Sequence, residues 1–200
     1  MQLCLERILF KRGMAMAKRS FVWQYLFKPR TVGAVLPSSK YLARKMVKSI
    51  DFENAKCIVE YGSGTGVFTE YILQMRNAAT IVILFETNEM FYQMLEERYK
   101  EEPNVYIVRD SAENVGWYLE KYNIQCVDYV VSGLPFASLP VEVSMKILQQ
   151  TKLYMNPAGG NFITFQYTLF KKDFIQQFFD TIEVTRELRN VPPAYVLRCY

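Results

Sequence analysis

The stretch CIVEYGSGTG, residues 57–66, carries the strongest structural signal in the chain. Residues 57–61 are of β-strand type and run directly into three glycines at alternate positions. A helical pattern then continues to about Met75. Glycines at such a junction permit a tight turn and let the backbone approach a ligand closely at a helix N-terminus. The stretch therefore predicts the first strand, ligand-binding loop and helix of an α/β sheet.

The rest of the chain alternates short apolar runs with helical patterns, which is typical of βαβ units and a mainly parallel sheet. The last two strands are expected to form an antiparallel hairpin at one edge. We therefore expect an α/β fold with a Rossmann-like, doubly wound, seven-stranded and mostly parallel sheet. The expected strands are residues 57–61, 80–85, 105–108, 127–132, 162–166, 182–186 and 194–199, and the expected later helices are residues 89–100, 141–154 and 172–179.

The glycine spacing and two acids at strand ends indicate the cofactor. The G-x-G-x-G spacing favours S-adenosylmethionine over a dinucleotide, which G-x-G-x-x-G would favour. Glu86 ends the second expected strand, where a carboxylate can accept from both ribose hydroxyls. Asp110 follows the third, where it can accept from the adenine amino group. A structural turn, a solvated carboxylate and a helix N-cap are the respective alternatives. The residues expected to bind the cofactor are Glu60, Gly62, Ser63, Gly64, Gly66, Glu86, Thr87, Asp110, Ser111, Ala112 and Ser132.

After the fourth expected strand the chain reads SGLPF at residues 132–136. This loop resembles the one that follows strand four in amino-group methyltransferases, including the Asn-Leu-Pro-Tyr of rRNA adenine dimethylases. Together with PRTVGAVLPSS at 29–39, VEYGSGTGVFT at 59–69 and RNVPPA at 189–194, it is similar to the bacterial phospholipid N-methyltransferase family. The resemblance covers the chain from about residue 20. Tyr61, where that family usually has Leu, and Ser63, where Pro is common, depart from it.

That resemblance implies methyl transfer to the amine of phosphatidylethanolamine-type headgroups. Methyl transfer from a sulfonium is an in-line displacement, so positioning and charge placement account for most of the rate effect. The amine must first lose a proton, and because the chain has no histidine, water, a carboxylate or Tyr167 is left to accept it. The carbonyls of residues 132–134 could orient the nitrogen, aromatic rings could face the growing cation, and Arg189 could hold a phosphate. Core packing of the rings and a surface arginine are the alternatives. The expected catalytic residues are Ser132, Gly133, Leu134, Phe136, Tyr167 and Arg189.

The net charge of +4 is unevenly distributed along the chain. Residues 1–50 hold eleven Lys and Arg against Glu6 alone, whereas residues 51–200 hold 13 basic and 19 acidic groups. We therefore expect a basic N-terminal amphipathic helical arm or lid at 1–50 and a methyltransferase domain at 51–200. The apolar stripe and flanking Lys and Arg of residues 7–30 suit an anionic lipid surface. A lid over the cofactor pocket and RNA binding remain alternatives.

The sequence thus favours a cytoplasmic N-methyltransferase, peripheral to the inner face of the cell membrane, that uses S-adenosylmethionine. An rRNA adenine or small-molecule amine N-methyltransferase is one alternative, and a non-catalytic, membrane-associated S-adenosylmethionine-binding protein is another. No run of 18 apolar residues exists, so no membrane span is expected. The four cysteines are far apart, so no metal site is expected.

Overall fold

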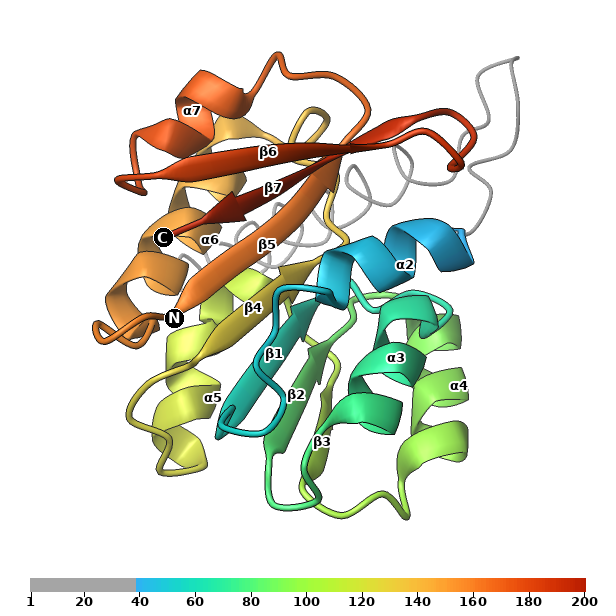
Figure 1. Ribbon diagram of the computed structural model, residues 1–200. Helices are drawn as coiled ribbons and strands as arrows, with labels where there is room; N and C mark the ends of the chain where they lie inside the picture. Colours follow the sequence, from blue (N-terminus) through green and yellow to red (C-terminus); the bar gives the residue numbers. More distant parts are fainter. Residues whose placement is uncertain (1–38) are drawn as a thin grey trace, which may run out of the picture. The chain divides into compact units, whose positions relative to one another are not determined.

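The computed structural model describes residues 39–200, which contain one seven-stranded sheet (Figure 1). The strand order is β3-β2-β1-β4-β5-β7-β6; the first five strands are parallel, and β7 is antiparallel to both of its neighbours. Strands β1, β2 and β4 are short apolar runs buried along most of their length, as expected for strands covered on both faces. The predicted doubly wound α/β sheet is confirmed. The strands are β1 Cys57–Tyr61, β2 Ile81–Phe85, β3 Val105–Val108, β4 Tyr129–Ser132, β5 Asn161–Gln166, β6 Ile182–Glu187 and β7 Ala194–Cys199.

Helices cover both faces of the sheet (Figure 1). Helices α2, α3 and α4 lie on one face and bury a continuous apolar cluster against the central strands. Helices α5, α6 and α7 lie on the other face, where aromatic rings fill much of the core. The helices are α2 Lys40–Val47, α3 Val67–Met75, α4 Glu89–Tyr99, α5 Val115–Lys121, α6 Val141–Tyr154 and α7 Lys172–Gln176, with a 3-10 turn η1 Ala112–Asn114.

Helix α2 lies within the stretch that the sequence analysis assigned to the basic arm, yet it packs in the core of the sheet domain. Ser39 caps it by accepting from the Leu42 N–H at 3.2 Å, and Leu42, Met46 and Val47 are buried. Apolar residues at this spacing form one face of an amphipathic helix. Residues 40–50 therefore support the fold itself. The predicted lipid-binding segment, residues 7–30, lies outside the described residues.

Two further differences from the expected elements have local causes. The predicted helix at 172–179 ends at Gln176, whose side-chain amide donates to the carbonyls of Phe179 and Asp180 and closes the turn. Helix α5 was not predicted, because seven residues are too few for a clear helical periodicity. Its Gly116 packs so closely on α6 that a Cβ there would lie 2.5 Å from the Tyr154 ring.

Candidate cofactor and acceptor site

The glycine loop lies where β1 ends, next to both β2 and β4, and this is the point at which the strand order reverses. Open α/β sheets bind ligands at that place. Gly62, Gly64 and Gly66 have φ of +67°, +53° and +80°, which side-chain-bearing residues rarely adopt. The N–H groups of Gly62 and Ser63 donate to the Phe85 carbonyl at 2.8 and 3.3 Å. The loop is thereby held against the end of β2.

The glycine loop also contacts the loop that follows β4, so the predicted cofactor and acceptor segments meet. Gly133 donates its N–H to the Tyr61 carbonyl at 2.8 Å. A Cβ at Gly133 would lie 2.8 Å from the Gly62 carbonyl oxygen, and a Cβ at Gly62 would lie 2.8 Å from Leu134 Cδ2. A Cβ at Gly64, by contrast, would meet nothing closer than 4.0 Å. The loop therefore presents open space at Gly64, as a ligand site requires.

Glu60 is a fully buried carboxylate directly before this loop. Its Oε2 accepts from the Thr69 hydroxyl at 2.7 Å. The buried Ser63 side chain lies close enough to lower the pKa of Glu60, although neither Oε1 nor the Ser63 hydroxyl forms a hydrogen bond of regular geometry within residues 39–200. Burial raises the pKa of Glu60 to about 8, and the charge of Glu86 adds to the rise. Buried polar atoms are normally well paired, so Oε1 and the Ser63 hydroxyl beside it have capacity for a further polar or cationic partner.

Glu86 lies at the end of β2, where it was predicted. Its Oε2 accepts from the Gly64 N–H at 2.8 Å and its Oε1 from the Asn88 N–H at 2.7 Å. Burial raises the pKa of this carboxyl, and the backbone N–H donors partly offset the rise. An ionised carboxylate offers about four acceptor positions, so two remain for the ribose hydroxyls. The adjacent Thr87 is exposed.

The segment 110–112 follows β3 and lies in the predicted place. Asp110 Oδ1 accepts from the Ser111 N–H at 2.7 Å and from Asn114 at 3.0 Å, and its Oδ2 accepts from the Tyr118 hydroxyl at 3.2 Å. Ser111 caps η1 through its hydroxyl, and Ala112 is buried. Three donors thus fix the orientation of Asp110 at the edge of the sheet.

The loop that follows β4, called the acceptor loop below, places the predicted residues Ser132 and Phe136 in the core. Ser132 is fully buried; its hydroxyl accepts from the Leu134 N–H at 3.2 Å, and its carbonyl accepts from Thr164 at 3.4 Å. Phe136 is also fully buried, and its ring lies edge-on against Phe162 with the centroids 5.9 Å apart. The prediction that the Phe136 ring faces the acceptor is therefore wrong, because the core on the α6 side covers it.

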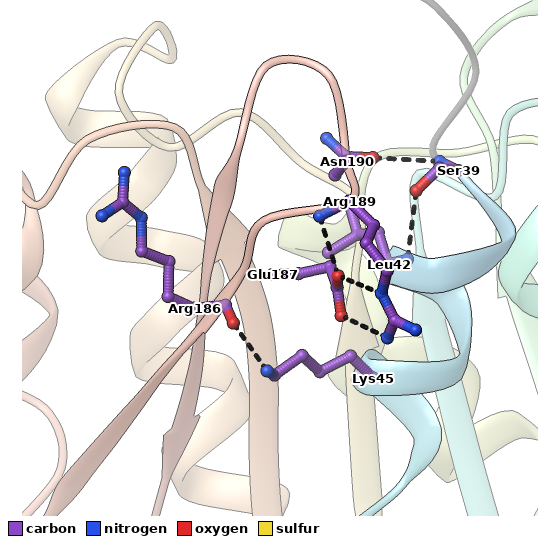
Figure 2. A network of polar contacts seen from close by, with 7 residues as sticks. All are labelled: Ser39, Leu42, Lys45, Arg186, Glu187, Arg189 and Asn190. Carbon is purple, nitrogen blue, oxygen red and sulfur yellow. Dashed lines mark hydrogen bonds and ion pairs between the residues drawn. The ribbon is translucent and has the colours of Figure 1, made fainter.

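Arg189 does not have the free guanidinium that phosphate binding was expected to need. Its Nε and Nη2 pair with both Glu187 oxygens at 3.0 and 3.2 Å (Figure 2). The guanidinium lies over the Tyr41 ring, 4.4 Å from the ring centroid. The Arg189 hydrogen bond lowers the pKa of Glu187 to about 2. The phosphate-binding role of Arg189 stays a prediction, and the Nε–Nη2 edge of its guanidinium is occupied by a carboxylate two residues away.

Tyr167 lies just beyond β5 and is 40% exposed. Partial burial raises the pKa of its hydroxyl above the ordinary value of 10, although the neighbouring Asn190 side chain reduces the shift. A phenol with a raised pKa is almost entirely protonated near pH 7. Tyr167 is therefore a poor base for deprotonating an amine, and water or a carboxylate remains for that role.

The sequence analysis missed Gln166, the last residue of β5. Its side chain is 4% exposed, and both its amide nitrogen and its amide oxygen are buried without a partner within the described chain. Ser132 pairs with Thr164 in the parallel register, so Gln166 lies level with the loop that follows β4. No motif marks this residue. The feature that could have revealed it is a polar residue at the end of an apolar strand that lies next to the acceptor loop.

These residues fit S-adenosylmethionine. The open backbone at Gly64 and the buried oxygens of Glu60 and Ser63 suit its charged methionine part, Glu86 suits its ribose, and Asp110 suits its adenine. Among residues 39–200, no group of three or more Cys, Asp and Glu side chains is arranged to hold a metal ion.

Comparisons with known proteins agree with this geometry. The family model described as ribosomal RNA adenine dimethylase matches residues 36–174. Over 180 residues, the chain is 32% identical to the ornithine lipid N-methyltransferase of Singulisphaera acidiphila, which covers 90% of this chain and 93% of that protein. Over 131 residues, it is 30% identical to ribosomal RNA small subunit methyltransferase A of Persephonella marina, covering 65% of this chain but 46% of that protein.

A solved rRNA methylase from Streptococcus thermophilus has the same fold, with a TM-score of 0.58 over 78% of this chain and 92% of that one, at 14% identity. The fold, the cofactor loop and the family match lead to one assignment. The chain belongs to the ribosomal RNA adenine dimethylase family of S-adenosylmethionine-dependent methyltransferases and is an N-methyltransferase.

Proposed function

We propose that this enzyme methylates the primary amine of a membrane-lipid headgroup. Ornithine lipids and phosphatidylethanolamine share that amine and are the two acceptors considered. The observation that carries the proposal is the full-length similarity to an ornithine lipid N-methyltransferase, which spans nearly all of both chains. The rRNA enzyme of Persephonella marina, in contrast, matches over less than half of its own length.

The acceptor loop supports an alkyl amine over an adenine base. In the Asn-Leu-Pro-Tyr of the dimethylases a side-chain amide precedes Leu-Pro, whereas here Gly133 precedes it. A Cβ at this position would collide with the Gly62 carbonyl, so no side chain fits there without a backbone shift. The aromatic residue of the loop, Phe136, is buried in the core. The loop thus offers neither an amide nor an accessible ring to a base.

Gln166 supplies a polar group that an amine headgroup can use. When bound, S-adenosylmethionine supplies the methyl group to a neutral amine. No residue of 39–200 hydrogen-bonds the buried Gln166 amide, and a buried amide without hydrogen bonds costs about 1–3 kcal/mol. The amide oxygen of Gln166 can accept an N–H of the amine and so orient its lone pair. Desolvation in the site lowers the pKa of the amine, which favours the reactive neutral form.

The enzyme would work at the inner face of the cell membrane, where both acceptors and cytosolic cofactor are accessible. The basic residues 7–30 are our proposed contact with anionic lipid. Within residues 39–200, no helix is long and apolar enough to cross a membrane.

The test is transfer of labelled methyl groups to three acceptors offered separately: vesicles with ornithine lipid, vesicles with phosphatidylethanolamine, and ribosomal RNA. The proposal expects label in one or both lipid fractions, and the comparison between them identifies the headgroup. Label in RNA alone would overturn it and favour the rRNA adenine alternative, which the family match also supports.

A further inference from the structure

Two turns at the carboxyl-terminal edge of the sheet expose large apolar side chains. The turn after β5 carries Leu169 and Phe170, which are 39% and 81% exposed. The turn between β6 and β7 carries Leu188 and Val191, which are 64% and 72% exposed. These four residues are called the apolar rim below. Exposed large apolar side chains that gather on adjacent turns commonly mark an interaction site.

The β6–β7 turn has an inverted burial pattern. Its polar residues Glu187 and Asn190 are buried, at 4% and 3% exposure, while the apolar Leu188 and Val191 between and beside them are exposed. Asn190 accepts from the Ser39 N–H at 3.1 Å (Figure 2). It also donates to the Pro192 carbonyl at 2.7 Å. The turn is therefore fastened to α2 by its polar side chains. This fastening holds the apolar residues outward.

The two turns belong to one surface. Gln166, the last residue of β5, pairs with Tyr195 near the start of β7, so the turns follow directly from paired strand ends. The Asn190 side chain lies close enough to the Tyr167 hydroxyl to affect its pKa. Figure 1 shows the β6–β7 turn beside the start of α2, in agreement with the Ser39–Asn190 bond. This is also the edge that holds the acceptor loop and Gln166.

The chain segments that carry or adjoin the apolar rim are rich in Lys and Arg, although residues 51–200 are acidic as a whole. The segments 39–45, 167–172 and 186–193 contain a single acid, Glu187, and it is paired with Arg189. The other basic residues of these segments form no ion pair with any described residue. They are Lys40, Arg44, Lys45, Lys171, Lys172 and Arg186.

We propose that the apolar rim and its basic surround are a docking surface for an anionic phospholipid bilayer. Exposed apolar tips flanked by Lys and Arg match the boundary between headgroups and acyl chains, where the apolar groups enter and the cations meet lipid phosphates. RNA phosphates would bind the Lys and Arg side chains, but they would not bury the exposed Phe170 and Val191. The proposal rests on the lipid-headgroup function above and deepens it, because docking here brings the acceptor edge of the sheet to the membrane.

The experiment measures sedimentation of the full chain with phosphatidylcholine–phosphatidylglycerol vesicles. The variants Phe170→Asp and Val191→Asp are each expected to lower partitioning about tenfold, because each loses the burial of one apolar side chain. The matched control is Leu153→Asp, a residue in the last turn of α6 that is 69% exposed and not part of the apolar rim. Its partitioning should stay within about twofold of wild type, on the same scale.

Two further readouts separate this proposal from its alternatives. The affinity for S-adenosylmethionine and the melting temperature should be unchanged in the rim variants. Wild-type partitioning in both rim variants would overturn the docking surface, and so would a lowered melting temperature, which would assign the rim to packing within the protein.

The docking surface and the proposed function can fail independently. Loss of vesicle binding in the rim variants, with no methylation of any lipid by wild type, would keep the docking surface and overturn the acceptor. Unchanged methylation of vesicle lipid by the variants would overturn the docking surface and keep the acceptor. The expected result is a variant that methylates lipid in detergent micelles normally and lipid in vesicles slowly.

Discussion

The glycine loop and the β6–β7 turn lie at the same edge of the sheet but have opposite chemistry. At the glycine loop, the oxygens of Glu60 and Ser63 are buried with few hydrogen bonds to other described residues, and positive-φ glycines let the backbone approach a ligand closely. At the turn, polar side chains are buried and fully bonded, while Leu188 and Val191 are exposed. The first region is suited to binding a small charged molecule in its interior. The second presents apolar groups outward. Cofactor binding and acceptor recruitment should therefore respond to different substitutions.

The largest effect is expected from Gly133→Ala, which tests whether the cofactor and acceptor loops depend on one another. The new Cβ would lie 2.8 Å from the Gly62 carbonyl, so the glycine loop must move. Overpacking of this kind costs about 1–3 kcal/mol, which corresponds to a loss of roughly 5- to 150-fold in S-adenosylmethionine affinity if the bound conformation bears the whole cost. Isothermal titration calorimetry measures it. Ser138→Ala, an exposed position in the same loop, should bind as wild type, and equal affinity in both variants would contradict the contact.

Glu60 should make cofactor binding depend on pH. In the free protein its folded-state pKa of about 8 lies above the ordinary 4.5, so its contribution to stability is present below pH 4.5 and is lost as pH rises through 8. The positive charge of the cofactor favours the ionised carboxylate. Binding should therefore tighten by up to about tenfold per pH unit as pH rises toward 8, and then level off.

Glu60→Gln removes this titration and can keep the Thr69 hydrogen bond. Its affinity should be nearly constant between pH 6 and 9, and its free form should not lose the stability that wild type loses over that range. Affinity titrations at each pH, with melting temperatures in parallel, measure both. A wild type with a flat profile would show that Glu60 does not face the cofactor.

Gln166→Leu tests most clearly whether acceptor recognition can be changed without changing cofactor binding. Removing an unpaired buried amide should stabilise the free protein by about 1 kcal/mol, because the cost of the orphaned group disappears. Lipid methylation should fall about tenfold at unchanged cofactor affinity, as expected for one lost hydrogen bond to the acceptor. If Gln166 has a purely structural role, the variant should instead be less stable than wild type. Its kcat/KM for the acceptor should then fall only as far as the loss of stability explains. Thermal melts and initial rates on both lipids decide between them.

The smallest effect on catalysis is expected from Phe136→Leu. The ring packs on Phe162 in the core, so the substitution should cost about 1 kcal/mol of stability and leave kcat within about twofold. Chemical denaturation and initial rates at saturating lipid measure the two quantities. A normal melting curve with a tenfold loss of kcat would restore Phe136 to the acceptor site.

The cofactor region could be predicted from sequence because each of its signals is local. Gly62, Glu86 and Asp110 all follow strand ends, and parallel strands bring their carboxyl ends to one edge. The side-chain positions on the acceptor side could not be predicted, because they depend on contacts with residues distant in sequence. Phe136 packs edge-on against Phe162, which in turn stacks on Phe179, and helix α2 provides Tyr41 beneath Arg189.

Gln166 is a candidate site residue that sequence reasoning missed for the same reason. Its buried amide lies beside the acceptor loop only because β4 and β5 are neighbouring parallel strands in this register. No residue pattern in the sequence predicts that register. Helix α2 could have been recognised, since Ser39 precedes buried positions at helical spacing. The strong basic charge of residues 1–50 pointed instead to a separate arm.

The central claim is that a lipid amine accepts the methyl group. Its most direct measurement is mass spectrometry of lipids recovered from vesicles after incubation with enzyme and S-adenosylmethionine. Each vesicle should hold either the free-amine lipid or the same lipid with its amine acetylated. The account predicts headgroup masses increased by whole methyl groups in the free-amine lipid alone. Unmodified lipid in both samples, with methylated adenine in ribosomal RNA treated in parallel, would contradict it.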